Sequence, residues 1–181
     1  YGGSYWGGLL KYDGETYTVF DTSNSSLQGA VGDAQRGRIA GLAFDEDNNL
    51  WVTNYLAGEP LSVLKADGTW KSFPLPCSNI TNTAQVVVDR RGYKWIMLYS
   101  KAASLIVFDD GGTIDDESDD RCVQLSASNT AIPSNSVNCL AVDVGGDIWV
   151  GTAEGPVVFD GGGDIFNGNQ GRRIKVEQDG V

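Results

Sequence analysis

The chain has 181 residues, of which 41% are hydrophobic, so it is long enough to bury one ordinary core. Its formal net charge is −11, which argues against nucleic acid as a partner, because phosphate-backbone binding needs clustered Lys and Arg. The sequence contains no histidine, which excludes Ser-His-Asp and Cys-His catalysis and every zinc site that needs a histidine ligand.

The first predicted element is a β-hairpin from Leu9 to Phe20, LLKYDGETYTVF, which turns at Asp13-Gly14. The same pattern returns as LSVLKADGTWKSF from Leu61 to Phe73, where another hairpin precedes it. The first copy lacks that partner, so we expect the chain to enter its first four-stranded unit at the third strand. The polar, Gly-rich run 21–37 then connects this unit to the next.

A second kind of hairpin recurs along the chain, first in IAGLAFDEDNNLWVTN from Ile39 to Asn54. An aspartate that closes one apolar run stands six residues before a tryptophan that opens another, with turn residues between them. The three pairs are Asp45/Trp51, Asp89/Trp95 and Asp143/Trp149. The tryptophans are spaced by 44 and then 54 residues, which indicates the repeated four-stranded blades of a β-propeller.

We therefore predict an all-β fold of about three and a half four-stranded antiparallel blades, with about fourteen strands, almost no helix and one propeller domain over 1–181. The blade units are 1–20 (partial), 38–74, 84–126 and 136–178, and the last strand runs from Arg173 to Glu177. Such an array cannot close a ring by itself, and the only methionine is Met97. We expect the chain to be a fragment of a larger propeller whose remainder covers the open blade faces.

The repeated aspartates and tryptophans are interpreted as structural residues. Equivalent positions in successive blades lie apart around a ring, so the aspartates do not converge on one substrate atom, and we expect them to cap the hairpin turns. One aromatic residue per blade is typical of packing between blades, so we expect the tryptophans to be mostly buried between blades.

The other candidate sites leave alternatives open. The acidic stretch 115–120 offers oxygen ligands for calcium but lacks the spacing of an EF-hand loop, so it is either a calcium site or a solvated loop. Cys77, Cys122 and Cys139 either include one disulfide or are small buried hydrophobic residues. The basic pair Arg36 and Arg38 is interpreted as solvated surface charge. No catalytic residue, metal ligand or cofactor is assigned.

Two hairpins carry a family resemblance. FDEDNNLWVTN, from Phe44 to Asn54, and VDVGGDIWVGT, from Val142 to Thr152, resemble the two-component-regulator propeller repeat, D-x-x-G-x-[LI]-W-[IV]-[GT]-[TN]. The fourth unit fits it best, whereas the second unit has Asn49 in place of the usual glycine. The resemblance covers nearly the whole chain.

Such repeats occur in periplasmic sensor regions of hybrid histidine kinases of Bacteroidetes, and in the PorZ group of surface proteins of the type IX secretion attachment complex. The runs from Gly7 to Gly14 and from Pro60 to Phe73, with the insertion after Phe108, are more similar to the PorZ group. The resemblance implies a non-enzymatic, extracytoplasmic module that binds a partner subunit or anionic lipopolysaccharide. The alternatives are a ligand-sensing propeller of a hybrid histidine kinase and a propeller hydrolase or lyase. No apolar run is long enough to span a membrane.

The binding face follows from blade topology. In each blade the turn between strands one and two opens on one side of the disc, and here those turns, DEDNN and DVGGD, are short and leave little room for a pocket. The links 54–60, 99–104 and 152–155 and the connections between blades open on the other side. Tyr55, Tyr99 and Lys101 lie in these links and form an aromatic and cationic group suited to a sugar or an anionic headgroup.

Overall fold

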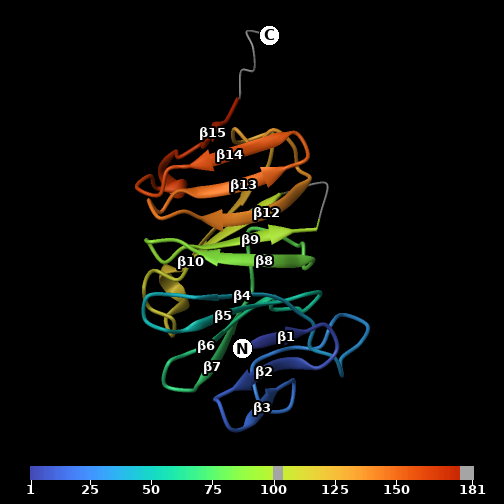
Figure 1. The fold of residues 1–181 in the computed structure, drawn as a ribbon. Helices are drawn as coiled ribbons and strands as arrows, with labels where there is room; N and C mark the ends of the chain where they lie inside the picture. The colour runs from blue at the N-terminus through green and yellow to red at the C-terminus, as the bar shows by residue number, and fades with distance from the viewer. Residues whose placement is uncertain (100–103, 176–181) are drawn as a thin grey trace.

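A computed structural model describes residues 1–99 and 104–175 of the chain. Within these ranges there are fifteen β-strands and two single-turn 3-10 helices. The strands form four antiparallel sheets, which follow one another in chain order from bottom to top in Figure 1. The predicted all-β propeller fold is confirmed, and each sheet corresponds to one blade. No helix in the described part of the chain has the length and apolar character needed to cross a membrane.

The first sheet contains one strand that the sequence interpretation missed. Its strands are β1 (Gly2–Ser4), β2 (Gly8–Tyr12) and β3 (Tyr17–Phe20). The β2–β3 hairpin corresponds to the third and fourth strands of the next sheet, so the chain enters this blade at the second strand, and the expected entry at the third strand is wrong. The sequence of β1, GGS, has no apolar pattern to reveal it, since this strand pairs with β2 through its backbone alone.

Each of the other three sheets contains four strands in simple up-and-down order. The second sheet consists of β4 (Ile39–Phe44), β5 (Leu50–Asn54), β6 (Leu61–Leu64) and β7 (Trp70–Phe73). The third consists of β8 (Thr83–Val88), β9 (Lys94–Leu98), β10 (Leu105–Asp109) and β11 (Arg121–Leu125), with the 3-10 helix η1 (Glu117–Asp119) before β11. The fourth consists of β12 (Val137–Val142), β13 (Ile148–Thr152), β14 (Gly155–Phe159) and β15 (Arg172–Arg173), with η2 (Ile165–Asn167) before β15.

The last strand is shorter than predicted. β15 has two residues, Arg172 and Arg173, which pair with Val158 and Val157 of β14. The strand therefore ends at Arg173, and the predicted continuation to 175 is wrong. The rest of that prediction, 176 and 177, and the end of the fourth unit at 178 lie outside the described residues.

The first strands of the complete sheets lie side by side, and each carries a register shift near its start, between Ile39 and Gly41 in β4. The approach between β4 and β8 is close, because a Cβ on Gly41 would lie 2.6 Å from the carbonyl oxygen of Ala84. Between β8 and β12, the side-chain amide of Gln85 accepts from the Leu140 N–H at 2.9 Å and donates to the Leu140 carbonyl at 2.8 Å. The Gln85 side chain therefore makes the two hydrogen bonds to Leu140 that a paired strand residue would make, although β8 and β12 belong to different sheets.

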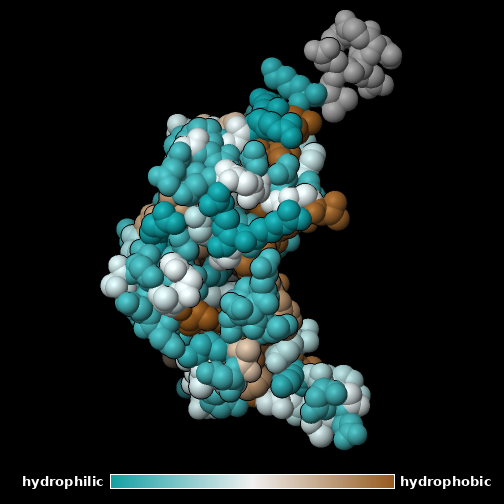
Figure 2. Space-filling view, turned by 90° about the vertical axis from the view of Figure 1, so that its left-hand side faces the viewer, coloured by the Kyte–Doolittle hydropathy of each residue, from teal (hydrophilic) through white to brown (hydrophobic). Residues whose placement is uncertain are grey.

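Apolar side chains fill the space between successive sheets. Trp51 and Phe73 of the second sheet pack with Ile96 and Phe108 of the third in one cluster, and Trp95 packs toward the fourth sheet in the next. Trp51 is fully buried and Trp95 is 2% exposed, as predicted. Trp149 differs from these two, since its side chain is 37% exposed. Trp149 lies on β13 in the fourth sheet, the last of the described sheets. The molecule as a whole has the outline of an open arc (Figure 2).

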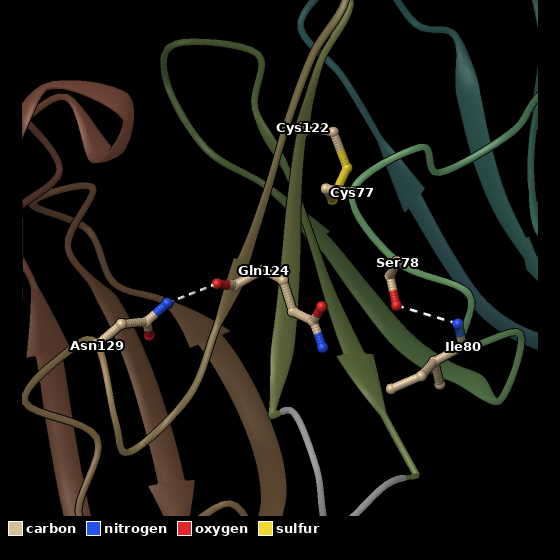
Figure 3. The surroundings of a disulfide bond; sticks show 6 residues. All are labelled: Cys77, Ser78, Ile80, Cys122, Gln124 and Asn129. Carbon is tan, nitrogen blue, oxygen red and sulfur yellow. Dashed lines mark hydrogen bonds between the residues drawn. A yellow bond between two sulfur atoms is a disulfide. The ribbon is translucent and has the colours of Figure 1, made fainter.

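A disulfide joins the second and third sheets. Cys77, in the segment after β7, is bonded to Cys122 of β11, 45 residues later (Figure 3). Cys139 is free and exposed, so the expectation of a small buried residue is wrong there. Its place on β12 explains this, because that surface is on the uncovered face of the last sheet.

The acidic insertion between β10 and β11 folds back over the preceding sheet. Asp115 forms a 3.0 Å ion pair with Lys65, and Glu117 forms one of 3.2 Å with Lys71. Both carboxylates remain exposed to solvent. Among the described residues, no group of three or more His, Cys, Asp or Glu side chains is placed to hold a metal ion.

Candidate binding face

The repeated Asp-Trp hairpin is a structural device. In each copy, one carboxylate oxygen accepts from the backbone N–H groups two and four residues later, which caps the turn as predicted. The other oxygen accepts from the tryptophan indole N–H, at 2.8 Å for Asp45 and Asp89 and 2.9 Å for Asp143. The bond from Trp149 is the largest cause that lowers the pKa of Asp143. Each aspartate thus stabilises its own hairpin. The six-residue spacing places the tryptophan indole within hydrogen-bond distance of the aspartate carboxylate.

Four aromatic side chains gather on the opposite side of the sheets, which we call the link face because it carries the β5–β6 and β9–β10 links. They are Tyr5, Trp6, Tyr55 and Tyr99, and we call them the aromatic cluster. Their ring centroids form a continuous series, with 5.6 Å from Trp6 to Tyr5, 5.7 Å from Tyr5 to Tyr55 and 6.4 Å from Tyr55 to Tyr99. These are normal distances for interacting aromatic pairs. The cluster is drawn from three different sheets.

Backbone hydrogen bonds hold the links that carry these rings. The N–H of Tyr55 donates to the carbonyl of Arg38 at 2.7 Å, and the N–H of Tyr99 donates to that of Asn82 at 2.8 Å. Within the β1–β2 link, the N–H of Trp6 donates to Oγ of Ser4 at 3.2 Å. Each ring is therefore positioned by a backbone that is itself fixed to a neighbouring segment.

Two arginines stack on the N-terminal end of the cluster. The guanidinium carbon of Arg36 lies 4.6 Å from the Trp6 ring centroid, and that of Arg38 lies 5.2 Å from both the Trp6 and the Tyr5 centroids. Asp33 is 3.4 Å from each guanidinium and balances one of the two charges. The Nε atom of Arg38 is buried and has no hydrogen-bond partner among the described residues. This end of the cluster therefore carries a net positive charge.

The aromatic cluster is open to solvent. Trp6 is 58% exposed and Tyr99 is 61% exposed, while Tyr5 is exposed and Tyr55 is half-buried. Large apolar rings that are grouped rather than scattered on a surface mark an interaction site. The combination of flat rings and guanidinium groups can stack on sugar rings or on other aromatic groups, and can pair with phosphate or carboxylate groups.

The structure describes two of the three predicted site residues. Tyr55 and Tyr99 lie next to each other, as their shared position after the second strand of a blade requires. Lys101 lies in 100–103, outside the described residues. Whether any of them binds a ligand stays a prediction.

The sequence interpretation missed the other half of the cluster. The dipeptide Tyr5-Trp6 lies between glycine-rich runs, in a segment that was not recognised as a link between strands. The arginine pair had been interpreted as solvated charge, whereas Arg38 is largely buried by the rings it stacks on. Two adjacent aromatic residues in a polar, glycine-rich segment were the available signal.

The opposite side, which we call the turn face, is more hollowed than expected. A pocket of about 240 Å³ lies between the turns that follow β4 and β8, so the expectation that short turns leave little room for a pocket is wrong. The gap between neighbouring sheets, rather than the length of either turn, creates it. At its base Lys94 is 2% exposed, with Nζ 2.7 Å from an Asp110 carboxylate oxygen and 3.9 Å from the Trp51 ring centroid. Lys94 takes the place that Leu50 and Ile148 have in the other hairpins.

Comparisons with known proteins agree with this fold. The family model described as "Two component regulator propeller" matches residues 131–154, which include the Asp143-Trp149 hairpin. No curated protein matches the chain. The chain carries a two-component-regulator propeller repeat, in agreement with the resemblance seen in the sequence.

Three solved structures are similar to the chain. PorZ, a surface component of the type-IX secretion system of Porphyromonas gingivalis, matches with a TM-score of 0.75 and 23% identity over 88% of this chain and 23% of PorZ. The extracellular domain of the putative hybrid two-component system BT3049 of B. thetaiotaomicron gives 0.55 and 14%, over 84% and 21%. Virginiamycin B lyase of Staphylococcus aureus gives 0.52 and 14%, over 80% and 43%.

The chain spans less than a quarter of the length of the first two structures. At these identities the likeness concerns the fold, and the chain is a propeller module that resembles PorZ and the extracellular domain of a hybrid two-component system.

Proposed function

We propose that the chain is a non-catalytic, extracytoplasmic binding module that contacts its ligand or partner through the aromatic cluster. The single observation that carries this proposal is the exposed series of four rings with two guanidinium groups stacked on one end. Such a surface is built for recognition, because rigid aromatic rings give a large contact area at low entropic cost. The complete absence of histidine also supports a role without acid–base catalysis near neutral pH.

The ligand that fits best is an anionic glycan such as lipopolysaccharide, or an anionic surface of a partner subunit. Sugar rings or apolar side chains would stack on Tyr5, Tyr55 and Tyr99, while phosphate or carboxylate groups would pair with Arg36 and Arg38. Lys101 is proposed as a further cation at the Tyr99 end. The likeness to PorZ supports a role in a cell-surface secretion complex.

The disulfide supports the extracytoplasmic location. Disulfides persist in the periplasm and at cell surfaces and are rare in the reducing cytoplasm, so the Cys77–Cys122 bond fits an oxidising compartment. Two of the similar structures are described as a bacterial surface component and an extracellular domain, which points the same way.

A second candidate is a ligand-sensing propeller of a hybrid two-component system, which the BT3049 likeness favours. The domains that accompany this module in the full-length protein would distinguish the two candidates. A second propeller and a β-sandwich sorting domain would support the secretion role, whereas a transmembrane helix and a kinase domain would support the sensor. The likeness to virginiamycin B lyase, at 14% identity, extends to the fold alone.

The test is a binding measurement with lipopolysaccharide immobilised on a sensor surface, and with the secretion-complex partner in parallel. Replacing Trp6, Tyr55 and Tyr99 together by alanine should weaken binding at least about tenfold. Each ring that becomes buried against the ligand contributes on the order of 1 kcal/mol or more to the binding free energy. Lys101→Ala is tested separately. Replacing Glu46 and Arg90 on the turn face is the matched control and should leave affinity unchanged. Unchanged affinity in the triple variant, with loss in the control, would assign binding to the turn face instead.

A further inference from the structure

A second pocket lies on the turn face, between the first and second sheets, and its lining differs from the rest of the protein. Its volume is about 220 Å³. Leu50 and Leu64 form an apolar floor, since they are 2% and 7% exposed and belong to the core between these two sheets. Phe20, Phe44 and Tyr1 add aromatic walls, with the Tyr1 and Phe44 rings in edge contact at 5.9 Å. We call it the amphipathic pocket.

The charges that line the amphipathic pocket are both positive. Lys11 reaches it from β2 and Lys65 from the end of β6, so the two cations come from different sheets. None of the ten lining residues is Asp or Glu, in a chain with 24 acidic and 13 basic residues. The pocket between the turns that follow β4 and β8, by contrast, is lined by five carboxylates as well as three cations, namely Asp45, Glu46, Asp47, Asp89 and Asp110 with Arg90, Arg91 and Lys94. Of these two pockets, only the amphipathic pocket is lined by cations without a carboxylate.

We infer that the amphipathic pocket binds a small aromatic carboxylate. The apolar floor and aromatic walls favour a ring, and the two ammonium groups favour an anion attached to it. Pockets for drug-sized ligands begin at roughly 300 Å³, so the volume restricts the ligand to about one ring. This site is separate from the aromatic cluster on the link face, so the inference does not depend on the proposed function.

Asp115 competes with the carboxylate of the ligand for the ammonium group of Lys65. Lys65 Nζ lies 3.0 and 3.1 Å from the two oxygens of Asp115, which comes from the acidic insertion and does not line the pocket. The Asp115 side chain is 75% exposed, so this pair is weak and a ligand carboxylate can displace it. Removal of the Asp115 charge should therefore tighten binding.

The experiment is titration calorimetry with phenylacetate, compared with its uncharged isostere phenylacetamide. The wild-type chain should bind the acid more tightly than the amide. Lys11→Gln and Lys65→Gln should each weaken phenylacetate binding about fivefold and leave phenylacetamide unaffected, because each removes one partly exposed charge pair. Asp115→Asn should strengthen phenylacetate binding by a similar factor.

Lys71→Gln is the matched control. Lys71 also pairs with the acidic insertion, through Glu117, but does not line the pocket, so its loss should not change binding. Equal affinity for acid and amide, or weakening by Lys71→Gln equal to that by Lys65→Gln, would overturn the inference. A thermal melt of each variant shows whether weaker binding is caused by loss of the fold or by loss of the site. Asp115→Asn is expected to increase affinity for phenylacetate, and unfolding cannot produce an increase.

Discussion

The indole N–H of Trp95 donates a 2.8 Å hydrogen bond to the carboxylate of Asp89, six residues earlier in the same hairpin. Both side chains are buried, at 2% and 6% exposed. The same pair in the last sheet, Asp143 and Trp149, is exposed. One motif therefore occurs in two solvent environments within a single chain, and this allows burial and hydrogen bonding to be tested separately.

Trp95→Ala should lower the free energy of unfolding by roughly 3–5 kcal/mol, because it leaves a cavity between the third and fourth sheets. Trp149→Ala should cost much less, since its side chain is 37% exposed. Urea denaturation of both variants measures the difference. If the Trp95 variant melted like wild type while ligand binding was lost, the ring would be a binding platform and its structural role would be wrong.

Asp89→Ala removes a carboxylate that accepts from two backbone N–H groups, those of Arg91 and Tyr93, as well as from Trp95. These donors would be left without partners in a buried site, so we expect a loss of about 3 kcal/mol in unfolding free energy. Asp143→Ala is the control, because water can replace its bonds. Equal losses in the two variants would show that burial does not set the cost.

The Asp13 carboxyl should titrate well below the ordinary pKa of an aspartate. Its carboxylate accepts hydrogen bonds from Thr16 N–H at 2.7 Å, Glu15 N–H at 2.9 Å and Thr16 Oγ at 2.8 Å, and these bonds lower its pKa from 3.8 to about 2. A lowered folded-state pKa means that the stabilisation is complete above pH 3.8 and is lost as the pH falls through about 2.

Carboxyl-carbon NMR of Asp13 measures this midpoint directly. Asp13→Asn should remove the corresponding part of the pH dependence of stability in that range. A midpoint near 3.8 would mean that the turn does not hold these hydrogen bonds in solution.

The Cys77–Cys122 disulfide closes a loop across a sequence separation of 45 residues. Its removal by Cys77→Ser with Cys122→Ser should cost about 4 kcal/mol, mainly because the unfolded chain regains conformational freedom. Chemical denaturation with and without a reductant measures this cost. Cys139→Ser should have no effect, and equal melts of the oxidised and reduced protein would contradict the prediction.

The sequence predicts the fold well where a pattern is local. The Asp-to-Trp spacing indicates each hairpin because aspartate, turn and indole interact within six residues. β1 was missed because its residues, GGS, have no apolar side chain that would form a strand pattern. The exposure of Trp149 also escaped prediction, because it depends on which sheets cover a face and not on the residue's own surroundings in the sequence.

The candidate site was only half predictable for a related reason. Tyr55 and Tyr99 occupy equivalent links of adjacent blades, so repeat alignment places them together. Tyr5 directly follows β1, the second strand of its blade, and so has the equivalent position, but the sequence of β1 has no apolar pattern by which the repeat could be aligned. Trp6 and Arg38 join the cluster through contacts that no spacing in the sequence reports. The amphipathic pocket and the pocket above Lys94 lie between neighbouring sheets and could not be predicted for the same reason.

The disulfide also sets how the chain responds to tension. A pull on the two ends of the protein cannot extend the 45-residue segment between Cys77 and Cys122, so roughly 160 Å of contour length stays hidden until the bond is reduced. The strands inside this segment, β8, β9 and β10, bear no load while the bond is intact, whereas the first, second and fourth sheets lie on the loaded path outside it. Under tension the disulfide would therefore hold most of the third sheet back while the strands on either side of it unfold.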